Sequence, residues 1–272
     1  MKTIIIINDN SPDAGHAAKF ALMMAAKMNA SILLANIQKV EKPVIEKALA
    51  GGSQNYTFKK TVPGLPGHSL TMFDKSELEP SIKEIDISEA NENQLAELIN
   101  KNNAWMVVKG MNAHLTTNSQ INLNTLLNKI ECPLLLIPAS FPLKSIERLV
   151  YIADLRYCRL PIVRYLAELA KNWQADLSIA HLSAKGLPDI EEHYACDIFN
   201  GDFCRRVNYD RLFFNNIKEK NLTTAIDVII NGLNNDLLVM VKSRFHFKKV
   251  IGECITGSLP ANITVPLLVF PY

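Results

Sequence analysis

Short runs of apolar residues recur along the chain, and each ends at a polar or turn-forming residue. The first run, Ile4 to Ile7, contains only β-branched residues and stops at Asn8. Runs of this length are too short for a core helix and are typical of strands that are covered on both faces, as in a parallel sheet. In the first half of the chain the pattern predicts strands at 4–7, 31–37, 81–87, 105–109 and 133–138.

Helical patterns separate these runs. Ser11 is a candidate helix N-cap, and Pro12 follows at the first helical position, where its missing N–H costs nothing. A second helix is expected at 92–101. Helices between strands predict right-handed crossovers and a parallel sheet. The apolar residues of the first helix fall on one face: Ala17, Phe20, Ala21, Met24 and Met28.

The opening unit recurs without a gap after 145 residues, so that positions 3–37 align with 148–182. Further strands are expected at 211–217 and 237–241, with a helix at 223–233 between them. The closing runs also match, since 133–138 and 266–271 both begin and end with proline. An internal repeat of this kind predicts two domains of one fold. We place them at 1–139 and 145–272, with a linker at 139–144.

One segment of the first half, residues 41–79, has no counterpart in this scheme. Gly51-Gly52, Pro63-Gly64 and Pro66-Gly67 interrupt any long element there. We expect a short helix followed by an irregular excursion, and the sequence indicates no role for it.

Composition excludes several classes of protein. The 272 residues carry a net charge of +2 with 21% charged residues, which provides no strong field for nucleic acid or an anionic membrane surface. The apolar run at the amino terminus is too short for a signal peptide or a membrane span. The five scattered cysteines form no CxxC pair and predict neither a disulfide framework nor a zinc site. A cytoplasmic protein without bound metal is expected.

The turn after the predicted strand at 237–241 is the first candidate for a ligand site, because α/β proteins bind ligands at the carboxyl ends of parallel strands. An acid also follows the first strand of each half. Alternatively, the acids simply cap the next helical turn and the basic residues form a solvated face. The candidate ligand-binding residues are Asp9, Asp154, Lys242, Ser243, Arg244 and His246.

This order of elements resembles the universal stress protein family. The resemblance is carried by 4–9 with Asn29-Ala30, by 151–154 with Ala175 and 179–182, by 236–241, and by the two closing strands. It implies two tandem Rossmann-like domains of the adenine nucleotide alpha hydrolase type, each a five-stranded parallel sheet of order 3-2-1-4-5 flanked by helices. In this family the closing strands of two domains commonly pair, so the two halves are expected to pair with each other. Formation of a homodimer stays open.

Family members that bind ATP use an aspartate after the first strand and a glycine motif after the fourth. The motif is Gly, two residues, Gly, nine residues, Gly and Ser or Thr, and its glycines let backbone N–H groups approach the phosphates. Asp9 and Asp154 match the first element, and the first half keeps only Gly110 of the motif. We therefore predict that the motif is lost. The second half replaces its glycines with Val241, Arg244 and approximately Cys254.

These patterns predict a non-enzymatic stress-response protein that binds a protein partner or a small ligand. The alternative is a sensor of an adenine nucleotide (ATP or AMP), with its site in the second half at Asp154 and the basic turn that follows the strand at 237–241. An enzyme is disfavoured because no Ser-Gly-Gly or His-x-Gly-His signature is present. His181 and His246 are expected to face one cleft, without a catalytic pair. An open cleft would indicate a sensor, and one filled by Phe245, Phe247 or Met111 would indicate a scaffold.

Overall fold

The computed structural model describes residues 2–37, 80–111, 121–184, 186–219, 221–255 and 258–272. The predicted helix and excursion at 41–79 lie outside these residues. In the first half the strands are β1 (Thr3–Asn8), β2 (Ser31–Asn36), β3 (Ile82–Asp86), β4 (Met106–Met111) and β5 (Leu134–Pro138). The helices are α1 (Pro12–Met28), α2 (Glu92–Lys101) and α3 (Leu123–Leu127).

The second half repeats this scheme with additional short helices. Its strands are β6 (Arg148–Ala153), β7 (Asp176–His181), β8 (Leu212–Asn216), β9 (Leu237–Val241) and β10 (Leu267–Phe270). Its helices are α4 (Leu160–Trp173), α5 (Glu192–Ile198), α6 (Leu222–Asp227) and α7 (Phe245–Val250). A 3-10 turn, η1 (Leu155–Tyr157), follows β6, and the π-helical segments η2 (Phe199–Cys204) and η3 (Val228–Gly232) extend α5 and α6.

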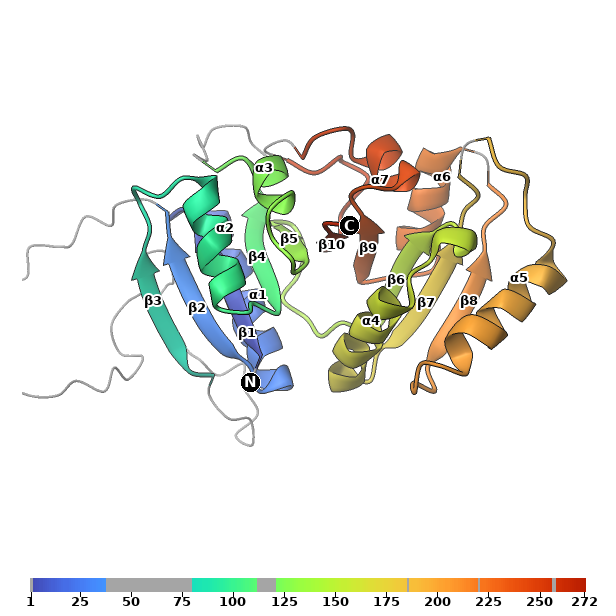
Figure 1. Ribbon diagram of the computed structural model, residues 1–272, viewed down its shortest axis with the longest axis horizontal. Helices are drawn as coiled ribbons and strands as arrows, with labels where there is room; N and C mark the ends of the chain where they lie inside the picture. Colours follow the sequence, from blue (N-terminus) through green and yellow to red (C-terminus); the bar gives the residue numbers. More distant parts are fainter. Residues whose placement is uncertain (1, 38–79, 112–120, 185, 220, 256–257) are drawn as a thin grey trace, which may run out of the picture.

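All ten strands belong to one sheet of order β3-β2-β1-β4-β5-β10-β9-β6-β7-β8. Within each half the pairing is parallel, and the order 3-2-1-4-5 predicted from the sequence is confirmed in both. Figure 1 shows β3 and β8 at the outer edges and β5 beside β10 at the centre. No helix among the residues described is long and apolar enough to cross a membrane.

The repeat of 145 residues holds at the level of element boundaries. It relates β1 to β6 and β2 to β7 at both ends, and it relates the last residues of α1 and α4. The two helices also end alike, because Asn29 (φ 50°) and Gln174 (φ 52°) both adopt the left-handed conformation that closes a helix. The helix starts differ, since the position equivalent to the start of α1 lies at the end of η1, and α4 begins three residues later.

The two halves join through β5 and β10, which pair antiparallel with Leu135 opposite Leu268. Both strands are buried along their whole length and consist of apolar residues and one proline. Pairing removes a strand edge from each half, and an unpaired apolar edge would otherwise be a site of aggregation.

Aromatic side chains also cross the junction between the halves. Trp105, just before β4, stacks on Tyr165 of α4 with ring centroids 4.3 Å apart, and the Tyr165 hydroxyl donates to the Trp105 carbonyl at 2.9 Å. Phe20 of α1 meets Trp173 of α4 edge to face at 6.1 Å. The junction is therefore packed on side chains as well as paired through the backbone.

Polar contacts tie the segments before and after α7 in the second half to α3 in the first. The Asn124 amide accepts from the backbone N–H of Ile255 at 2.9 Å and donates to its carbonyl at 3.2 Å, as a paired strand would. The Lys242 ammonium donates to the Asn124 carbonyl at 2.9 Å and to Asn128 Oδ1 at 2.6 Å. Lys242 is thus directed toward the first half.

Replacing Asn124 should destabilise the protein measurably. Asn124→Ala leaves both backbone groups of the buried Ile255 without their partners, which we expect to cost about 1–3 kcal/mol. Urea denaturation at pH 7 measures the loss. The control is Asn172→Ala, an exposed amide bonded within its own helix, for which a change below about 0.5 kcal/mol is expected. Equal effects of the two substitutions would contradict the role of Asn124 in joining the two halves.

Candidate functional site

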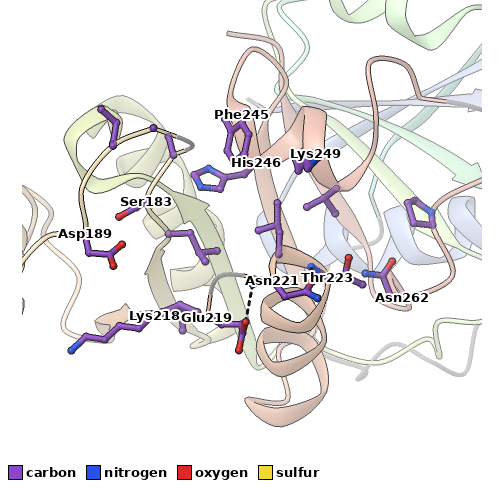
Figure 2. A pocket seen from close by; sticks show the side chains of 18 residues that line it. Ser183, Asp189, Lys218, Glu219, Asn221, Thr223, Phe245, His246, Lys249 and Asn262 are labelled. Carbon is purple, nitrogen blue, oxygen red and sulfur yellow. Dashed lines mark hydrogen bonds between the residues drawn. The ribbon is translucent and has the colours of Figure 1, made fainter.

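The second half has a large cleft at the carboxyl ends of β7 and β8. Its volume is about 690 Å³, and its walls are the loop after β7, the segment between β8 and α6, and α7. Figure 2 shows Ser183 and Asp189 on one side of the cleft and Lys249 on the other. The polar residues that line it are Ser183, Asp189, Lys218, Glu219, Asn221, Thr223, His246, Lys249 and Asn262.

A smaller hollow of about 170 Å³ adjoins the cleft where β6 and β9 lie side by side. This is the topological switch point of the second half, because the chain leaves β6 toward β7 on one side and reaches β9 on the other. Ala184, Phe245 and His246 line both spaces. The hollow brings together four of the six predicted site residues: Asp154, Ser243, Arg244 and His246.

The carboxylate of Asp154 is fully engaged by its own chain. Arg156 donates from Nε to Oδ1 at 2.8 Å and from Nη2 to Oδ2 at 2.6 Å, and the backbone N–H groups of Arg156 and Ala184 donate as well. Burial raises the pKa of Asp154, but these hydrogen bonds outweigh it and leave the pKa below the ordinary value. Asp154 is therefore ionised, caps η1, and holds the loop that follows β7.

The basic residues of the turn after β9 lie in different environments. Arg244 lies over the Tyr157 ring at 5.4 Å and lines the hollow. Lys249 lines the cleft, whereas its neighbour Lys248 lies 3.8 Å from Glu253 and lines neither space. With Lys242 directed toward the first half, Arg244 and Lys249 are the cations that this turn presents to a ligand.

His181 and His246 are both buried, at 1% and 3% exposure. His181 Nδ1 accepts from the backbone N–H of Leu155 at 3.0 Å, so its proton lies on Nε2, 3.4 Å from Ser183 Oγ. Burial lowers the pKa of both imidazoles. His246 lines the cleft and the hollow, whereas His181 lines neither and has a structural role.

Ser183 and His181 do not form a pair of nucleophile and base in this arrangement. Ser183 and His181 are adjacent, but the imidazole nitrogen that faces the hydroxyl already carries the proton and cannot act as its base. Among the residues that the structure describes, no group of three or more His, Cys, Asp or Glu side chains could hold a metal ion.

In the first half, a buried ion pair occupies the position equivalent to that of Asp154. Lys109 of β4 donates to Asp9 at 2.9 Å, with the two side chains only 5% and 6% exposed. Burial raises the pKa of Asp9, but the Lys109 ammonium and the Ser11 hydrogen bonds outweigh it and leave the pKa below the ordinary value. A Cβ at Gly110 would lie 2.2 Å from the Asp13 carbonyl oxygen, so β4 and the start of α1 are in direct contact. The position corresponding to Lys109 in the second half holds the apolar Met240.

Several residues of the cleft were not identified from the sequence. Ser183, Asn221 and Thr223 follow strands that the sequence predicted, and the rule that ligands bind at strand ends would have found them if applied to β7 and β8 as well as to β9. Asn262 precedes β10 and carries no such signal. Phe245 lines the cleft without filling it, and Phe247 and Met111 are core residues.

Substitutions at the ion pair of the first half should be strongly coupled. Asp9→Asn leaves the Lys109 ammonium buried without a counter-charge, which we expect to cost about 3–5 kcal/mol of unfolding free energy. Combining it with Lys109→Met, the residue of the second half, should recover a large part of the loss. Urea denaturation of the two single variants and the double variant at pH 7 gives the coupling. Additive losses would show that the pair is not one unit.

Comparison with known proteins gives a likeness of fold. No family model and no curated protein sequence matches the chain. A universal stress protein from Archaeoglobus fulgidus DSM 4304 superposes with a TM-score of 0.57 at 11% identity, covering 98% of this chain and 97% of its own. A putative universal stress protein from Pseudomonas aeruginosa UCBPP-PA14 gives 0.54 at 10% identity, with coverages of 99% and 93%.

A protein of unknown function from Pseudomonas aeruginosa PAO1 is equally similar, with a TM-score of 0.57, 11% identity, and coverages of 99% and 92%. All three matches extend over both halves of this chain and nearly the whole of the other protein. The strand order of each half and the span of these matches lead to one conclusion: the chain has the fold of the universal stress proteins, present in two copies.

Proposed function

We propose that this protein is a non-enzymatic stress-response protein that acts by binding a small ligand in its second half. The observation that carries the proposal is the cleft of about 690 Å³ joined to the hollow over Asp154, at the carboxyl edge of the sheet. Ligand pockets in proteins have volumes of about 300–1,000 Å³ and combine apolar walls with a few polar groups. The role in stress response rests on the likeness of fold alone.

The absence of enzymatic activity is inferred from the chemistry of the cleft. Ser183 faces an imidazole nitrogen that carries the proton, and Asp154 is held by Arg156. Neither group is placed to attack a substrate or to remove a proton from it. A cytoplasmic location accords with the five cysteines, all of which are unpaired.

An adenine nucleotide is the second candidate for the ligand. It is favoured by the hollow, which gathers an acid, a hydroxyl and two basic side chains: Asp154, Ser243, Arg244 and His246. The turn from Lys242 to Ile251 contains no glycine, so backbone N–H groups cannot surround a triphosphate there. A monophosphate such as AMP needs fewer such contacts and is the better fit. The first half is a poorer site, because Asp9 and Lys109 are buried there as an ion pair and line neither the cleft nor the hollow.

AMP should stabilise the protein against heat more than ATP does. A ligand that binds only the native state contributes about 2.7 kcal/mol at 100 times its dissociation constant. Thermal shift assays with AMP, ADP, ATP and adenosine at matched concentrations measure the effect. If no nucleotide or nucleoside shifts the transition, the second candidate is wrong. If ATP stabilises more than AMP, our argument from the missing glycines is wrong.

Two neighbouring lysines on α7 allow a matched test of the cleft. Lys249→Gln removes a cation from the cleft wall, and Lys248→Gln makes the same change in charge on the same helix outside it. For AMP we expect Lys249→Gln to weaken binding about 2–5-fold at low salt, as for an exposed ion pair, and Lys248→Gln to leave it unchanged. Isothermal titration calorimetry at two salt concentrations measures both. Equal losses would place the ligand elsewhere on the surface.

A further inference from the structure

The imidazole of His246 has an unusual position in the cleft. It is 3% exposed, and its Nε2 forms no hydrogen bond within the part of the chain that the structure describes. Two other buried side-chain nitrogens there also lack partners, those of Trp173 and Asn216, but neither residue lines the cleft or the hollow. Buried polar groups without partners are rare, and one in the wall of a cleft is a candidate contact for a ligand atom.

The surroundings of His246 keep it neutral in the unliganded protein. Burial lowers its pKa and is the strongest influence. The Leu182 carbonyl and Asp154 favour the charged form, and His181 opposes it. Lys249 lies one turn further along α7, Asp189, Lys218 and Glu219 line the same cleft, and Arg244 lines the hollow. Among the described residues, Asp154 is the acid that favours the charged imidazole, and Arg156 already neutralises it.

The wall around His246 also shows how a ligand could reach it. Phe245 packs edge to face on the imidazole, with ring centroids 5.6 Å apart, and is half-buried between the cleft and the hollow. Figure 2 shows the two rings next to each other at the side of the cleft. Since Nε2 has almost no exposed surface, contact with a ligand requires a neighbouring side chain to move, and Phe245 is an adjacent ring that lines both spaces.

We propose that His246 recognises the anionic group of the ligand and that binding takes up a proton onto its imidazole. An anion within hydrogen-bonding distance of Nε2 supplies the negative charge that is missing from the free protein. Since the coupling between proton and ligand is reciprocal, a lower pH then strengthens binding. This inference rests on the proposed function, because it concerns the ligand of the same cleft. It identifies the ligand as a small molecule that bears a phosphate or carboxylate group.

Calorimetry with AMP tests the proposal on the full-length protein. Titrations at pH 7 in buffers of different ionisation enthalpy give the number of protons taken up on binding. The variant His246→Gln keeps an N–H donor at this position but cannot be protonated there. The phosphate of AMP, whose second pKa is about 6, can take up a proton with either protein, so the comparison isolates the contribution of His246. We expect the wild type to take up more protons than the variant. Its affinity should rise up to about tenfold per unit of pH between 8 and 6, and that of the variant should change less.

The outcomes separate the inference from the proposed function. Equal proton uptake and equal pH dependence in the two proteins would overturn the role of His246 and leave ligand binding intact. Failure of both AMP and inorganic phosphate to bind the wild type would overturn the small-ligand proposal and this inference with it. If the variant does not fold, AMP and adenosine are compared on the wild type. The proposal predicts that AMP binding takes up more protons than adenosine binding plus the phosphate's own contribution. If the uptake with AMP is no larger than that sum, the proposal is overturned.

Discussion

The antiparallel pairing of β5 with β10 is the interaction on which the rest of the structure depends. Each half ends in a short strand that is apolar on both faces, and such a strand cannot remain at the edge of a sheet in water. Pairing the two strands with each other satisfies their backbone groups and produces one sheet of ten strands. It also brings α3 of the first half next to Lys242 and Ile255, which flank α7, so that each half helps to shape the other.

With the halves fixed in this way, the duplicated position after the first strand has diverged. Both copies contain a buried aspartate after the first strand, and each aspartate is neutralised by a cation from its own half. In the first half the cation is Lys109, buried in β4, and the position is closed. In the second half it is Arg156, whose side chain is 25% exposed, and Asp154 lines the hollow. Within the described residues, the aspartate of the first half is therefore buried in an ion pair, while that of the second half borders a space at the edge where α/β proteins bind ligands.

The sequence was sufficient for the architecture and for a part of the site. Runs of apolar residues and the shift of 145 residues gave the strands and the duplication, because burial on both faces leaves little choice of residue type. The order of the strands came from the resemblance to the universal stress proteins. The sequence also placed Asp154, Ser243, Arg244 and His246 at one edge. It could not show that Lys242 binds α3, or that Arg156 occupies Asp154, because both are contacts of long side chains whose directions depend on tertiary packing. The polar residues after β7 and β8 follow predicted strands and could have been found by the same rule, whereas Asn262 carries no such signal.

The junction between the halves has a practical consequence for spectroscopy. The chain contains two tryptophans, and both lie at this junction: Trp105 stacks on Tyr165 of the opposite half, and Trp173 packs on Phe20 across the same boundary. Tryptophan emission from the native protein therefore originates where the two copies meet. Any event that separates or rotates the copies changes the surroundings of every fluorophore excited at 295 nm, so the molecule carries its own optical probe of that movement.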